Sequence, residues 1–247
     1  MIKSSNPVLN SNVFRNERSV GKTESMTVQG TVNKTGILFF ILLFSASLVW
    51  TRYFNGQNID VLMGVGGIVG FITALITMFN KKIANLSGPV YAFAKGLFIG
   101  GLSAKIELIY PGIVIQAVGL TFATLFSLLG AYKSGMIKVT ENFKLGVAAA
   151  TGGLFLFYLI SFFMSFFGIN FGISLINGSN IIGILFSFFV VGLAALNLVM
   201  EFDFIESGEV YGAPKYMEWY SAFGLMVTLI WLYIEILRLV MKLSSRD

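Results

Sequence analysis

Residues 181–200 read IIGILFSFFVVGLAALNLVM, a run without a single charged side chain. At a rise of 1.5 Å per residue, about 20 residues of helix cross a hydrocarbon core roughly 30 Å thick. This run is therefore predicted to be a transmembrane helix, and it sets the length scale for reading the rest of the chain.

Apolar stretches of similar length recur from Gly36 to the end of the 247-residue chain, which is 56% hydrophobic and only 12% charged, with mean hydropathy +0.82. The predicted spans are Gly36–Tyr53, Val61–Phe79, Pro89–Ile109, Gly112–Tyr132, Leu145–Phe167, Asn180–Phe204 and Trp219–Leu243. The sequence thus predicts an all-α polytopic membrane protein with seven transmembrane helices. One membrane domain, residues 36–247, follows a flexible polar N-terminal arm at residues 1–35.

Composition excludes several kinds of chemistry. The chain has no cysteine and no histidine, which removes disulfides, thiolate chemistry and the commonest metal ligand. Any pH response therefore has to come from carboxylates. The net charge of +5 and pI near 9.4 do not indicate nucleic-acid binding, because the basic residues lie mainly in loops that flank spans. We expect membrane lipid as a partner, and neither nucleic acid nor a cofactor.

Basic residues predict the orientation, because loops rich in Lys and Arg stay on the cytoplasmic side. Those on the side of the arm are Lys3, Arg15, Arg18, Lys22, Lys34, Lys81, Lys82, Lys133, Lys138, Lys144 and Lys215. The opposite loops offer little beyond Arg52. The N-terminus is predicted to be cytoplasmic and, if all seven segments span, the C-terminus lies outside. Lys242 and Arg246 oppose that last step, which leaves a re-entrant final segment as an alternative.

Glycines in the second and third spans predict close helix packing. Gly66 and Gly70 are four residues apart, as are Gly96 and Gly100. Small residues at this spacing let two helices approach closely. Packing is the favoured reading of these glycines, in preference to a binding site.

Charged residues within apolar segments are the candidate functional residues, because a charge in hydrocarbon costs about 2.5–3.5 kcal/mol even on the lenient insertion scale. They are Lys95, Lys105, Glu107, Glu201, Asp203, Glu206, Glu235 and Arg238. Helical rise places Lys95, Asp203 and the hydroxyl of Thr228 towards the inner side. It places Lys105, Glu107, Glu235 and Arg238 towards the outer side.

A structural reading stands beside each functional one. Asp203 and Glu206 are then solvated at the membrane edge, and Lys95 reaches back to lipid phosphates. Glu235 and Arg238 form an i, i+3 pair on one helix face. An intramembrane enzyme is disfavoured, because Ser103 and Lys105 lie two residues apart rather than one helical turn.

Several motifs together resemble those of the bacterial Bax inhibitor-1-like membrane proteins, of the transmembrane Bax inhibitor motif superfamily. They are Ser4–Leu9 (SSNPVL), Met26–Val28 (MTV), Lys34–Thr35, Tyr110–Val114 (YPGIV) with Gln116–Val118 (QAV), Tyr132–Gly135 (YKSG), Glu218–Gly224 (EWYSAFG) and Trp231–Arg238 (WLYIEILR). The resemblance covers nearly the whole chain. It implies a seven-helix fold with a central last helix, in the bacterial cytoplasmic (inner) membrane.

The resemblance also implies a function, since relatives in the wider family act as pH-sensitive calcium leaks. In those relatives an aspartate on the sixth helix and one on the seventh gate the pore with a nearby arginine. The surroundings of Asp203 match the first aspartate, whereas Thr228 stands at the second when Arg238 is matched to a later arginine of the helix. The two-carboxylate pair is thus missing, and Lys95 stands where relatives often carry a glutamate.

These residues lead to the expectation of a pH-sensitive leak for calcium or another cation, with Asp203, Glu235, Arg238, Lys95, Thr228 and Glu107 along the path or its gate. A Lys95–Asp203 pair is predicted to close the cytoplasmic end. Asp203 is the one expected metal contact, a weak and transient one for calcium. A proton-coupled secondary transporter and a noncatalytic protein that acts through partners remain alternatives, and no protein partner is identified.

Overall fold

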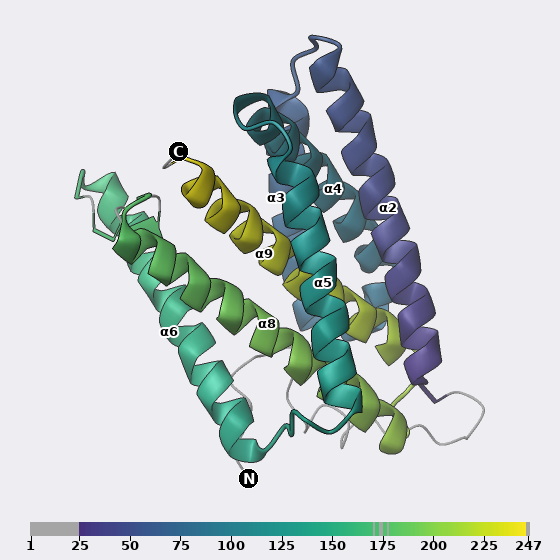
Figure 1. Cartoon of the computed structure of the whole chain (residues 1–247). Helices are drawn as coiled ribbons and strands as arrows, with labels where there is room; N and C mark the ends of the chain where they lie inside the picture. The colour runs from purple at the N-terminus through teal and green to yellow at the C-terminus, as the bar shows by residue number, and fades with distance from the viewer. Residues whose placement is uncertain (1–24, 170, 173–174, 177, 246–247) are drawn as a thin grey trace. The chain divides into compact units, whose positions relative to one another are not determined.

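The computed structural model describes residues 25–169, 171–172, 175–176 and 178–245. Within them, seven long α-helices follow one another, together with the short 3₁₀ helix η2 at Lys81–Ile83 (Figure 1). The helices are α2 (Val28–Phe54), α3 (Asp60–Phe79), α4 (Ala84–Ile109), α5 (Ile113–Lys133), α6 (Glu141–Phe166), α8 (Ile181–Val210) and α9 (Met217–Ser244). The motif at residues 4–9, the basic residues before residue 25 and Arg246 lie outside the described residues.

Two helix starts differ most from those predicted. α2 begins at Val28 rather than at Gly36, because Thr27 caps it with an extended backbone and a side chain that accepts a hydrogen bond from the Gly30 N–H. α4 begins at Ala84, so that Pro89 lies inside the helix instead of opening it. Hydropathy alone marks neither start, since both lie in polar segments.

Six of the seven helices, all except α4, are long and apolar enough to cross a membrane. α4 carries Lys95, Lys105 and Glu107, and a large part of it is buried. A helix enclosed by protein tolerates polar groups that lipid would not. The predicted all-helical membrane fold is confirmed at the level of six apolar helices, while a seventh span is not.

The chain forms two compact units, each described by itself. Of the described residues, 25–114 and 203–227 belong to the N-terminal unit, and those within 115–202 and 228–245 to the C-terminal unit. α8 and α9 contribute residues to both.

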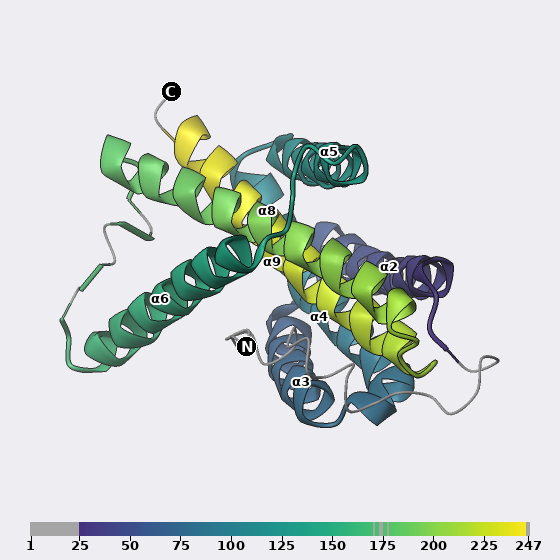
Figure 2. The ribbon, with the colours of Figure 1, turned by 90° about the horizontal axis from the view of Figure 1, so that it is seen from below.

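In the N-terminal unit, α4 packs against α2 and α3 (Figure 2). Glycines set how closely these helices approach. A Cβ at Gly66 would lie 2.5 Å from the Ala94 carbonyl oxygen, and one at Gly100 would lie 2.6 Å from the Ala46 Cα. A Cβ at Gly96 would collide with the Leu42 carbonyl oxygen. The predicted packing role of these glycines is therefore confirmed, and any larger residue would separate the backbones.

In the C-terminal unit, α8 and α9 run antiparallel. The Thr228 hydroxyl of α9 donates to Glu201 of α8, and nearer the C-terminal end of α9 Lys242 donates to the Ser187 hydroxyl, near the start of α8. The two contacts fit a single antiparallel register. α6 also makes a polar contact with α8, where the Asn197 side chain donates to the Thr151 hydroxyl of α6 at 2.9 Å.

Large apolar side chains cover the outer faces of the less buried helices. They include Phe40, Phe71, Phe126 and Phe155, each more than half exposed. Less than a quarter of the apolar window is buried in α2, α3, α5 and α6, against half in α8 and most in α9. Exposed apolar surface on this scale is what lipid covers in a membrane protein.

Candidate functional site

One buried acidic contact in the C-terminal unit joins α8 to α9. The Glu201 residue is 5% exposed, and its Oε1 accepts a hydrogen bond from the Thr228 hydroxyl at 2.5 Å. Its Oε2 has no hydrogen-bond partner among the described residues. A carboxyl group so placed is costly to ionise without a compensating cation, and this contact is the main candidate for a gate.

The family resemblance predicts Asp203 for this role, two residues further along α8. Residues two apart on a helix point in directions about 200° apart. The structure brings Glu201 to Thr228, whereas Asp203 is half-buried and belongs to the N-terminal unit, and Glu206 is exposed. The gating role of Asp203 stays a prediction, and Glu201 joins it as a candidate that the resemblance does not mark.

Lys95 lies half-buried on α4 among apolar and aromatic groups. Its stem packs on Gly70, where an added Cβ would meet the lysine Cε at 3.0 Å. Its Nζ lies 6.0 Å from the centre of the Tyr91 ring and 5.6 Å from that of Phe98. These are distances for weak cation–π contacts, which offset part of the cost of placing a lysine here. The predicted pairing of Lys95 with Asp203 is not tested by these contacts.

Glu235 and Arg238, further along α9, form a cluster with Tyr158 of α6, which we call the charged triad. Both oxygens of the Glu235 carboxylate, buried at 3% exposure, lie 2.8 Å from Nη1 of Arg238. The Tyr158 hydroxyl on α6 approaches the same two groups at 3.5 and 3.4 Å. The i, i+3 pairing expected from the sequence is present, and Tyr158 extends it to a neighbouring helix.

Lys105 and Glu107 have separate contacts in the N-terminal unit. Lys105 pairs with Asp60 at the start of α3 at 2.5 Å, with both side chains well exposed. Glu107 accepts hydrogen bonds from the backbone N–H groups of Gly112 at 2.6 Å and Val114 at 3.1 Å, and thereby caps the first turn of α5. Capping a helix start gives Glu107 a structural role, and its place along an ion path stays a prediction.

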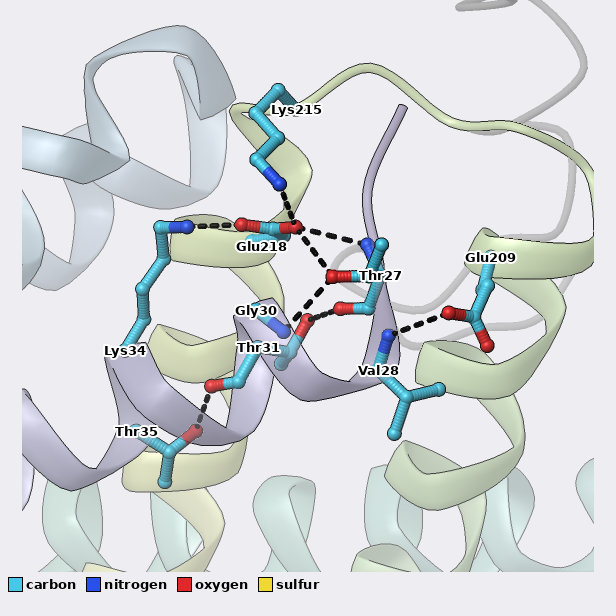
Figure 3. A network of polar contacts seen from close by, with 9 residues as sticks. All are labelled: Thr27, Val28, Gly30, Thr31, Lys34, Thr35, Glu209, Lys215 and Glu218. Carbon is cyan, nitrogen blue, oxygen red and sulfur yellow. Dashed lines mark hydrogen bonds and ion pairs between the residues drawn. The ribbon is translucent and has the colours of Figure 1, made fainter. Parts of the chain in front are cut away.

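A further network, centred on Glu218, was not predicted (Figure 3). Its side chain is fully buried in the first turn of α9. One carboxylate oxygen pairs with Lys34 of α2, and the other lies 2.8 Å from the Lys215 ammonium. That second oxygen also accepts hydrogen bonds from the Thr27 N–H at 2.9 Å and the Thr27 hydroxyl at 3.1 Å.

The same network fastens the start of α2 to the connection between α8 and α9. The Met26 N–H donates to the Ala213 carbonyl at 2.7 Å, and the Val28 N–H donates to Glu209 at 3.1 Å. Met26 is 1% exposed. Glu218 thus satisfies donors at a helix start that would otherwise be left without partners. The sequence pointed to this network only in that Lys34 and Glu218 both belong to motifs that carry the family resemblance.

Among the described residues, no three His, Cys, Asp or Glu side chains gather closely enough to hold a metal ion. The weak calcium contact predicted at Asp203 has no such cluster to support it.

Apolar helices of membrane-spanning length, with charged groups in specific buried contacts, define a polytopic α-helical membrane protein. A family described as Bax inhibitor 1 like matches residues 6–245, nearly the whole chain. The chain therefore belongs to this family. Comparison with curated proteins and comparison with solved structures give no match.

Proposed function

We propose that the protein is a pH-sensitive leak for cations such as calcium, gated at the contact between Glu201 and Thr228. The observation that carries the proposal is the position of Glu201: a buried acid, bonded to one hydroxyl, with its second oxygen unpartnered among the described residues. Membership of the family supports a leak as the activity.

The physical basis is the cost of charge in an apolar helix. Gain or loss of a proton at Glu201 changes the charge at the contact of α8 with α9, and the free energy of that change is available to shift the two helices. The two Glu201 oxygens and the Thr228 hydroxyl are hard donors of the kind that calcium prefers. One carboxylate with one hydroxyl binds more weakly than two carboxylates, which favours a leak over a storage site.

Calcium entry into proteoliposomes that contain the purified full chain tests the proposal over pH values from acid to mildly alkaline. We expect flux above that of empty vesicles and dependent on pH. Glu201→Gln should flatten the pH dependence and change the flux several-fold. Glu206→Gln, a matched control on the exposed part of the same helix, should leave both unchanged.

Further variants separate the candidate residues. Asp203→Asn and Glu235→Gln test the two other acids. Thr228→Asp restores two carboxylates at the contact and should make the pH response steeper. If Glu201→Gln behaves as wild type while Asp203→Asn abolishes the pH response, the gate lies at Asp203.

No flux at any pH, from protein shown to be folded and inserted, would overturn the leak. Saturable counterflow of a solute would then indicate a transporter driven by protons. A stable complex with another protein, without flux, would indicate action through partners. Orientation with the N-terminus in the cytoplasm of a bacterium remains part of the proposal, and labelling of residues near Lys34 from either side of the membrane tests it.

A further inference from the structure

Lys242, near the C-terminal end of α9, is buried in the C-terminal unit at 2% exposure. A lysine ammonium has three N–H donors. Among the described residues, it donates three hydrogen bonds: to the Leu175 carbonyl at 3.1 Å, the Gly183 carbonyl at 2.9 Å and the Ser187 hydroxyl at 2.8 Å. All three acceptors are neutral, and two of them belong to the first two turns of α8.

The charged groups that precede Lys242 on α9 do not neutralise it. Arg238, one turn earlier, is itself a cation, and it lies against both oxygens of the Glu235 carboxylate. Glu235 and Arg238 therefore balance each other, and the charge of Lys242 remains in a cage of carbonyl and hydroxyl oxygens.

A buried cation surrounded by neutral oxygens resembles the way in which proteins hold a monovalent metal ion. Carbonyl oxygens replace the hydration shell of such ions in selectivity filters. An ammonium group is a compact point charge, and here it reaches the oxygens on an apolar four-carbon stem. The cage thus has the donor atoms and the distances of a small cation site, with the cation supplied by the chain itself.

We propose that Lys242 is a tethered cation: it fills an oxygen site formed by Leu175, Gly183 and Ser187, and it keeps free monovalent cations such as potassium or ammonium out of that site. This inference extends the proposed leak. Only the predicted effect of Lys242 on flux rests on the leak, whereas the oxygen site itself does not. Lys242 then acts as a fixed positive barrier near one end of α9, remote in sequence from the contact of Glu201 with Thr228.

Chemical rescue tests the cage without any flux measurement. In purified full-length Lys242→Ala, the emptied cage should accept a free cation. The thermal midpoint of this variant should rise in ammonium or potassium chloride, and level off with concentration, but not in choline chloride at equal ionic strength. Wild type and Lys105→Ala, a lysine variant at an exposed pair, should respond alike to all three salts.

Two further variants keep the test decisive. If Lys242→Ala does not fold, Lys242→Ser, which retains one hydroxyl in the cage, must show the same selective response. Adding Ser187→Ala to either variant removes a cage oxygen and should weaken the response. Equal stabilisation by all three salts would overturn the cage and leave Lys242 as a structural clip.

Flux then tests the barrier. Rubidium entry into proteoliposomes should rise several-fold in Lys242→Ala relative to wild type, and should not change in Lys105→Ala. Selective rescue with no flux from any variant would retain the cage and refute the proposed leak. Selective rescue with equal rubidium flux in wild type and Lys242→Ala would refute the barrier.

Discussion

Replacement of Glu218 by glutamine tests whether the charge of the buried carboxylate holds α2 to the start of α9. The change keeps the size of the side chain but removes the charge that Lys34 and Lys215 share. One carboxylate oxygen becomes an NH₂ group, so a donor must face either Lys34 or the donors of Thr27. Neither orientation satisfies the whole network.

The expected cost follows from the exposure of each partner. Lys215 is 55% exposed, so its pair with Glu218 contributes about 0–1 kcal/mol. Lys34 is 17% exposed, and loss of a hydrogen bond to a charged group costs about 1.5–3 kcal/mol. With a donor left facing a donor in a buried position, Glu218→Gln should cost about 2–4 kcal/mol. For a chain of this size, that lowers the melting temperature on the order of 10 °C.

Thermal unfolding of the purified full chain in detergent, followed by tryptophan fluorescence at one fixed scan rate, measures the effect. Glu209→Gln is the matched control, because among the described residues this exposed glutamate accepts only the Val28 N–H, which a glutamine oxygen also accepts. The reasoning further predicts that Lys34→Met destabilises more than Lys215→Met. An unchanged midpoint for Glu218→Gln, or equal losses for the two lysine variants, would refute it.

Two other predictions concern packing and the charged triad. Gly100→Val should lower the midpoint by the equivalent of about 1–3 kcal/mol or prevent folding, because the valine side chain would meet the backbone of α2. Gly119→Val should melt as wild type does, because the space around Gly119 is open. Arg238→Met should cost about 3–5 kcal/mol of stability, because it leaves the buried Glu235 carboxylate without its cation. Tyr158→Phe removes only hydrogen bonds of 3.4–3.5 Å and should cost under about 1 kcal/mol. Equal midpoints within either pair of variants would contradict the corresponding assignment.

Apolar run lengths and residue spacing were enough to predict the class of protein, the approximate helices and the glycine faces by which helices pack. These properties are local: the length of an apolar run sets a membrane helix, and a four-residue spacing of glycines places them on one face. Gly66, Gly96 and Gly100 could therefore be assigned to helix packing without knowledge of their partners. The pair of Glu235 and Arg238 was equally accessible, because both residues lie on one helix.

Contacts between residues far apart in the chain could not be predicted in this way, because they depend on how the helices pack. A shift of one or two residues in register turns a different side chain of α8 towards α9, and hydropathy does not specify that register. Glu201 rather than Asp203 meets Thr228 for this reason. The start of α2 at Val28 depends likewise on Glu218, which lies 191 residues from Thr27 in the sequence. The burial of Lys242 depends on carbonyl groups of α8 and of the segment before α8. Such partners are set by how the helices pack, which no single apolar segment encodes.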